Sequence, residues 1–163
     1  TPRTMAYVVK NALNPYQWNA VVGYSALSWV NNGLAEKSKP CDQIVFILGD
    51  NMFSWVAGTP RKPGNPPVVQ SYMNSSMYKI RDAIGDKPCV WVGPTYGGNG
   101  PVYQKTAADL DAMYKALKIS LERINCKLID SRGNWKYSGP DGLHYNPGQD
   151  SEAWGNWIVE KLK

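Results

Sequence analysis

The sequence has no apolar run that approaches the roughly 20 residues of a membrane-spanning helix. It also has no cluster of Lys and Arg and no Cys/His spacing typical of a zinc or RNA-binding motif. The net charge of +5 is spread along the chain, so we expect no membrane span, no nucleic-acid partner and no metal site. Repeats, linkers and low-complexity segments are absent too, which favours one domain over residues 1–163.

Cysteine is scarce, with Cys41, Cys89 and Cys126 in the whole chain. An odd number leaves at least one of them unpaired within a monomer. Each stands just before an apolar, strand-like run, so we expect them together at the amino ends of strands. A disulfide between two of them and buried free thiols both fit this placement. A cysteine nucleophile is not expected, because sites in parallel α/β sheets lie at the carboxyl ends of strands.

Histidine occurs once, as His144. Asp141 stands three residues before it, and Gly and Pro on both sides indicate a loop. An imidazole beside a carboxylate can act as a general base whose tautomer the carboxylate fixes. The alternative is a loop histidine held by ordinary hydrogen bonds.

Phenylalanine is also rare, whereas tryptophan and tyrosine are abundant: two Phe stand against seven Trp and ten Tyr. Trp and Tyr offer flat apolar faces with a polar edge, as sugar-binding clefts require, and they also fill cores. We expect most of them in the core.

The hydrophobic pattern predicts helices alternating with short strands. Thr1 and Pro2 fit the N-cap and first residue of an opening helix. The continuous apolar run 43–48 predicts a strand buried on both faces. The capping-box pair Thr106 and Asp109 begins a long helix. The expected elements are helices 1–13, 24–32, 69–84, 106–124 and 149–163 and strands 18–23, 43–48, 89–92 and 127–129.

This order favours an α/β fold, a three-layer α/β/α sandwich of the flavodoxin-like type with a parallel sheet. Three polar segments fall at carboxyl ends of its strands: residues 23–28, 49–51 and 141–144. Carboxamides and backbone N–H groups at such places are good oxyanion donors. Together with His144, they point to acyl transfer.

These segments resemble the marked sequence blocks of the SGNH (GDSL-type) hydrolases, a superfamily of esterases and lipases. Asp141-Gly-Leu-His144 matches the Asp-x-x-His block before the last helix. Gly49-Asp-Asn51 follows a strand, as does the family's Gly-x-Asn-Asp block, although Met52 replaces the final Asp. Gly23-Tyr-Ser-Ala26 approximates the Gly-x-Ser-Gly block.

The resemblance implies a role for each matching residue. His144 is the base and Asp141 orients it, while Asn51 and the N–H of Ala26 form the oxyanion hole. Ser25 supports the turn or is a candidate nucleophile. No metal or cofactor is implied.

The block that supplies the family's Gly-Asp-Ser nucleophile has no counterpart in this sequence. In the family that block follows a first strand that lies in the middle of the sheet, so this strand is also expected to be missing and the domain to be incomplete at its N-terminus. Three explanations are open: a longer native chain, a docked N-terminal peptide that completes the sheet, or a rearranged sheet. A start at Thr1 is typical of a processed or secreted chain and leaves the compartment open.

We therefore expect an SGNH-like serine esterase or deacylase that removes acetyl or other acyl groups from a small-molecule, carbohydrate or cell-wall ester. One alternative is a catalytically silent module that binds glycans or proteins. Another is a cell-wall glycan hydrolase that uses Asp50 or Asp141 as acid or base.

Overall fold

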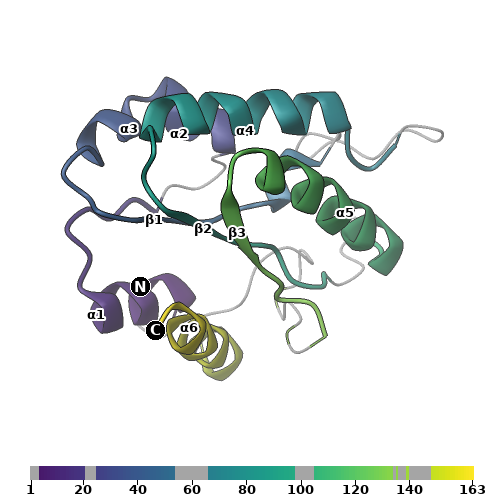
Figure 1. The fold of residues 1–163 in the computed structure, drawn as a ribbon. Coiled ribbons are helices and arrows are strands. Elements are labelled where there is room, and N and C mark those ends of the chain that lie inside the picture. Colours follow the sequence, from purple (N-terminus) through teal and green to yellow (C-terminus); the bar gives the residue numbers. More distant parts are fainter. Residues whose placement is uncertain are drawn as a thin grey trace.

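The computed structural model of the protein describes residues 4–20, 25–53, 66–97, 105–133, 135, 139 and 148–163. These residues form a parallel sheet with helices on both faces (Figure 1). The predicted α/β sandwich is confirmed. Within the described ranges, no helix is both long and apolar enough to cross a membrane.

The described strands form one sheet in the order β1 (Ile44–Ile47), β2 (Cys89–Val92) and β3 (Cys126–Ile129), and both pairings are parallel. Phe46, Trp91 and Leu128 lie side by side in register. The rings of Phe46 and Trp91 are 5.2 Å apart between centroids. All four residues of the central strand β2 are buried. Alternation along each strand supplies apolar side chains to both helical layers.

One layer of helices packs on the face that carries Phe46 and Trp91. Its core includes buried side chains from every helix of that layer. The helices are α2 (Ala26–Asn31), α3 (Leu34–Lys37), α4 (Gln70–Ile84) and α5 (Ala107–Arg123).

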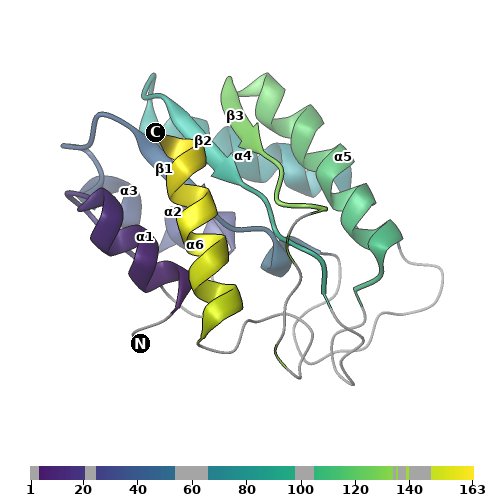
Figure 2. The same ribbon diagram turned by 90° about the horizontal axis from the view of Figure 1, so that it is seen from below.

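The opposite face is covered by α1 (Met5–Leu13) and α6 (Gln149–Leu162), which lie side by side in Figures 1 and 2. The Met5 N–H donates to Ser151 Oγ at 2.8 Å, so the two helices begin together and run parallel. A Cβ on Gly155 would lie 2.9 Å from Val8 Cβ. Glycine at this position allows the close approach of α1 and α6.

Local sequence signals explain the helix boundaries. The Thr106 hydroxyl accepts from the Asp109 N–H, and the Asp109 carboxylate accepts from the Thr106 N–H, which is the predicted capping box. The prediction for α1 was wrong at its start: Thr4 is the N-cap and accepts from the Tyr7 N–H. Both Thr1 and Thr4 could serve as the N-cap, and Pro2, which is typical of a first helical residue, wrongly indicated Thr1.

Two further predictions need correction. Residues 18–20 of the predicted strand 18–23 are not in a strand, and residues 21–23 lie outside the described residues. In β1 the side chains alternate between buried and half-buried, so this strand is not fully buried on both faces. One face of β1 is therefore buried more completely than the other.

The amino ends of the strands hold the cysteines, as predicted. Cys89 and Cys126, the first residues of β2 and β3, form a disulfide, and Cys41 is free. Arg81 of α4 lies beside them. Its guanidinium donates to the carbonyls of Ile124 and Lys87, the latter at 2.9 Å.

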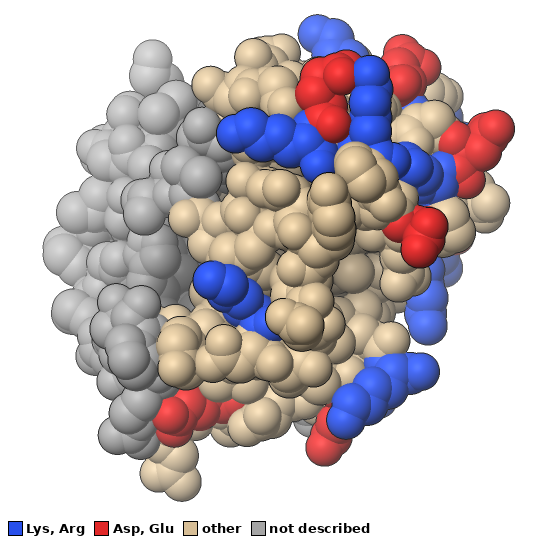
Figure 3. All heavy atoms as spheres, turned by 90° about the vertical axis from the view of Figure 1, so that its left-hand side faces the viewer, with Lys and Arg blue, Asp and Glu red and all other residues tan. Residues whose placement is uncertain are grey.

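Charged side chains are dispersed over the face shown in Figure 3. Basic and acidic groups intermix along its margin, and the described area between them is mostly uncharged. The exposed residues Lys39 and Glu36 form an ion pair, with Nζ and Oε2 2.5 Å apart. The net positive charge therefore does not gather into one basic patch on the part of this face that the structure describes.

Candidate functional site at the carboxyl edge of the sheet

The chain turns abruptly where β1 ends. Leu48 and Gly49 lead into the single 3-10 turn η1 (Asp50–Met52). The Trp91 indole N–H donates to the Leu48 carbonyl at 2.9 Å, which fixes the end of the strand. Gly49 has φ 156°, and a Cβ there would lie 2.4 Å from the Pro94 side chain. Glycine is therefore required where this turn packs against the segment after β2.

Asp50 and Lys105 form an ion pair beneath this turn. Lys105 Nζ lies 2.6 Å from Asp50 Oδ1 and also donates to the Thr95 carbonyl at 2.7 Å. The Lys105 side chain is fully buried, while that of Asp50 is 21% exposed. One ammonium group thus joins the turn after β1, the segment after β2 and the residue that precedes the N-cap of α5.

Burial lowers the pKa of Lys105 below its ordinary value, because desolvation penalises the charged form. The charge and hydrogen bond of Asp50 act in the opposite direction and do not fully compensate.

A second set of contacts joins the segments after β2 and β3. The Tyr114 hydroxyl donates to the Pro94 carbonyl at 2.8 Å and accepts from the Ser131 N–H at 2.9 Å. Burial raises the pKa of Tyr114 well above its ordinary value, so the hydroxyl stays protonated. The Thr95 hydroxyl donates to the Trp135 carbonyl. The ends of all three strands are therefore held by side chains.

Arg132 and Asp130 form an exposed ion pair just beyond β3. Burial opposes ionisation of Asp130, but the hydrogen bonds and charge of Arg132 outweigh it and hold the pKa of Asp130 below its ordinary value. Arg132 also pairs with Asp111 of α5 at 2.8 Å and lies 4.2 Å from the centroid of the Tyr114 ring. Arg132 thereby links the segment after β3 to α5 at this edge of the sheet.

Three of the predicted site residues lie within the described part of the chain. Asn51 is exposed on η1, directly after the Asp50 carboxylate that Lys105 binds. Ser25 is the N-cap of α2: its side chain accepts from the Ser28 N–H, and Ser28 Oγ accepts from the Ser25 N–H. Ala26, the first residue of α2, is fully buried.

His144 and Asp141 lie outside the described residues, so their distances to Asn51 and Ser25 are not defined. Their roles as base and orienting carboxylate therefore stay predictions. Among the described residues, no group of three His, Cys, Asp or Glu side chains could hold a metal ion.

Lys105 and Tyr114 are polar groups that sequence reasoning missed. Each contacts segments far away in the sequence, and Lys105 is 55 residues from Asp50. No local motif marks such a partner. Lys105 does precede a capping box, which places it at the amino end of α5 and hence near the carboxyl edge of the sheet.

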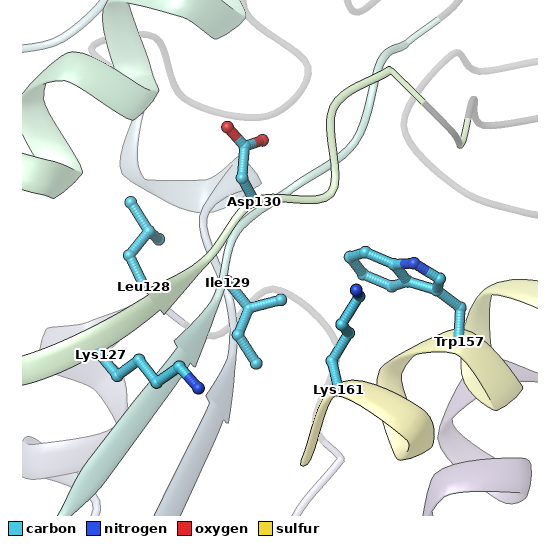
Figure 4. A pocket seen from close by; sticks show the side chains of 6 residues that line it. All are labelled: Lys127, Leu128, Ile129, Asp130, Trp157 and Lys161. Carbon is cyan, nitrogen blue, oxygen red and sulfur yellow. The ribbon is translucent and has the colours of Figure 1, made fainter. Parts of the chain in front are cut away.

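An open groove with a volume of about 360 Å³ lies elsewhere, between β3 and α6 (Figure 4). Trp157 and Lys161 project from α6 towards β3, where Lys127 and Ile129 point to the same side. Asp130 also borders the groove, but its carboxylate points away from Trp157. Ser25, Ala26 and Asn51 are not among the lining residues, so this groove is separate from the described residues of the predicted site.

Comparison with known proteins places this geometry in context. No protein-family model matches the chain. Protein BcsX of Komagataeibacter xylinus is 31% identical over 130 residues, which are 78% of this chain and 45% of that protein. The chain thus spans less than half the length of this curated relative.

Several solved structures share the fold. The lipase/acylhydrolase from Enterococcus faecalis has a TM-score of 0.63 at 18% identity, over 99% of this chain and 86% of that one. The inhibitor-bound M. smegmatis aryl esterase has a TM-score of 0.71 at 11% identity, with 98% and 84% covered. A carbohydrate acetylesterase family member from Sinorhizobium meliloti has a TM-score of 0.63 at 13% identity, with 97% and 84% covered. The chain therefore has the fold of the SGNH (GDSL-type) hydrolases.

Proposed function

We propose that this protein is an SGNH-like serine hydrolase that removes acyl groups, acetyl among them, from a carbohydrate ester. The observation that carries the proposal is the position of Asn51. It follows β1 on a tightly held turn at the carboxyl edge of the sheet, in a fold that esterases and acetylesterases share. Ligands of open α/β sheets bind at this edge.

In the proposed reaction, a serine hydroxyl attacks the ester carbonyl and His144 accepts its proton. Asp141 keeps the imidazole in the required tautomer. The Asn51 side-chain amide and the Ala26 N–H donate to the oxyanion that develops on the carbonyl oxygen. His144 then returns the proton to the departing alcohol, and water releases the acyl group in a second cycle.

The nucleophile is proposed to be a serine on a segment before Thr1, with Ser25 as the alternative. Ser25 Oγ lies 3.1 Å from Ser28 Oγ, and its side chain also caps α2. These contacts favour a supporting role, because a capping hydroxyl is held by the helix rather than aimed at a substrate.

A carbohydrate ester is proposed on two grounds. Two solved structures with this fold are carbohydrate acetylesterases, and the chain is rich in Trp and Tyr. Glycan cleavage by Asp50 is less well supported, because its carboxylate binds the buried Lys105 ammonium. A general acid needs to exchange its proton with the substrate.

The experiment compares hydrolysis of p-nitrophenyl acetate and an acetylated oligosaccharide by the full native protein and by His144→Ala. We expect His144→Ala to lose about 10³-fold or more in kcat. Asp150→Asn is the control, because Asp150 is an exposed carboxylate on α6. Equal rates for the native protein and His144→Ala would contradict the proposal, and so would the absence of hydrolysis in the native protein.

A further inference from the structure

Lys105 is a buried cation at the edge of the sheet where Asn51 lies. It is 2% exposed, and its ammonium lies between Asp50 Oδ1 and the Thr95 carbonyl at 2.6 and 2.7 Å. A carboxylate and a backbone carbonyl thus both hold Nζ in position. The ammonium fixes these partners in turn.

The Asp50 carboxylate belongs to the turn that presents Asn51. Gly49 packs on the ring of Pro94 on one side of this turn, and Met52 is buried on the other. The carboxylate–ammonium contact adds a third restraint, which connects the turn to Thr95 and to the start of α5. Together these contacts determine where the Asn51 backbone can lie.

Burial of a charged pair is a poor way to gain stability, because desolvation offsets most of the attraction. An apolar pair of similar volume would serve the fold at least as well. The best-attested benefit of a buried ion pair is that it selects one arrangement among several. At this edge of the sheet, the arrangement that it selects is that of the Asn51 turn.

We infer that Lys105 is a positioning residue of the proposed hydrolase, which holds Asp50 and thereby fixes the Asn51 turn at the distance that the oxyanion requires. The inference rests on the proposed function. Lys105 does not touch the substrate, because its side chain is fully buried. Its effect is transmitted through Asp50, and a shift of about 1 Å in a reacting group can cost about 10²-fold in rate.

The test is the steady-state kinetics of Lys105→Met with p-nitrophenyl acetate. We expect kcat to fall about 10- to 100-fold with KM within about 3-fold of the native value, because an oxyanion donor acts mainly in the transition state. Lys118→Met is the matched control, since Lys118 is an exposed lysine on the same helix α5. It removes the same charge and should leave both constants unchanged.

A double-mutant cycle separates positioning from general destabilisation. If Lys105 acts through Asp50, the loss of kcat in Asp50→Asn/Lys105→Met is close to that of the worse single variant, not the product of both. Should Lys105→Met alone fail to fold, the double variant still removes both charges of the pair. A kcat of the double variant close to that of Asp50→Asn then supports the positioning role, and a much lower kcat overturns it.

The outcomes distinguish the two claims. Native kcat in Lys105→Met or in the double variant overturns the positioning role and leaves the proposed function intact. Multiplicative losses in the cycle also overturn it. A native protein that hydrolyses no ester overturns the proposed function, and the positioning role falls with it.

Discussion

The two edges of the sheet differ in what a bridging cationic side chain binds. At the amino edge, Arg81 donates to backbone carbonyls beside the Cys89–Cys126 disulfide. At the carboxyl edge, Lys105 binds a carbonyl and also the carboxylate of Asp50, on the turn that carries Asn51. Both cations join loops that are distant in sequence. Arg81 joins backbone carbonyls and the Cys89 sulfur, whereas Lys105 holds a turn with an exposed polar side chain.

We expect this difference to separate stability from catalysis within one fold. At the amino edge, the Cys89–Cys126 disulfide and the hydrogen bonds of the Arg81 guanidinium stabilise the fold. The carboxyl edge is restrained by hydrogen bonds and by the ion pairs Lys105–Asp50 and Arg132–Asp130, and it leaves Asn51 exposed. We therefore expect substitutions at the amino edge to change the free energy of unfolding and substitutions at the carboxyl edge to change kcat.

Among substitutions that test this separation of the two edges, the largest expected effect is that of Asn51→Ala at the carboxyl edge. Loss of one oxyanion donor lowers kcat about 10²- to 10³-fold, and removal of an exposed side chain leaves the free energy of unfolding within about 0.5 kcal/mol. Ester hydrolysis and urea unfolding measure the two quantities. Asn31→Ala on α2 is the control, because Asn31 is also exposed. Native kcat in Asn51→Ala would remove Asn51 from the proposed site.

The second-largest expected effect is that of removing the Cys89–Cys126 disulfide at the amino edge. The double variant Cys89→Ala/Cys126→Ala opens a link between residues 37 apart. It should lower the free energy of unfolding by about 2–4 kcal/mol. We expect kcat to stay within about 3-fold at a temperature where the variant is folded. A large fall in kcat without loss of stability would contradict the separation of the two edges.

Arg81→Met is expected to have a somewhat smaller effect. Four carbonyls, those of Gly85, Lys87, Ile124 and Asn125, lose a charged donor, which should lower the free energy of unfolding by about 1–3 kcal/mol. Urea unfolding measures this loss. Arg123→Met is the matched control, because Arg123 is an exposed arginine near the end of α5. Equal free energies of unfolding for the two variants would show that the hydrogen bonds of Arg81 do not stabilise the amino edge.

The smallest predicted effect is that of Asp130→Asn, and it depends on pH. The pKa of Asp130 is lowered in the folded protein, so the ion pair stabilises the fold above the unfolded value of about 3.9. This contribution disappears as pH falls through the folded pKa. Because the Asp130 side chain is 44% exposed, it should be less than about 1 kcal/mol.

Urea unfolding of the native protein and Asp130→Asn at neutral pH and near pH 2 measures it. The native protein should be the more stable at neutral pH, and the difference should vanish in acid. A difference that persists at the low pH would be inconsistent with an ionised Asp130 as its origin.

Much of the fold could be predicted because its elements carry local signals. The apolar positions of α4 recur at helical spacing, and Met73, Met77, Ile80 and Ile84 are buried as that spacing predicts. The Thr106–Asp109 capping box marks the start of α5. Where two local signals compete, as at Thr1 and Thr4, tertiary contacts decide. Ser151 of α6 binds the Met5 N–H and stabilises the later start.

The candidate site was harder to predict, for a physical reason. Short motifs predict roles for Asn51 and Ala26, but the side chains that hold the Asn51 turn come from elsewhere in the sequence. The partners Lys105 and Asp50 are 55 residues apart, and the Tyr114 hydroxyl binds Pro94 and Ser131 on two different segments. Such pairs are set by topology, and no local pattern encodes them.

The central claim is that a serine activated by His144 works at the carboxyl edge of this sheet. The most direct test is labelling of the full native protein and of His144→Ala with a fluorophosphonate, followed by mass-spectrometric mapping of the modified peptide. The account predicts one labelled serine in the native protein and strongly reduced labelling in His144→Ala. An unlabelled native protein, or equal labelling of both proteins, would contradict it.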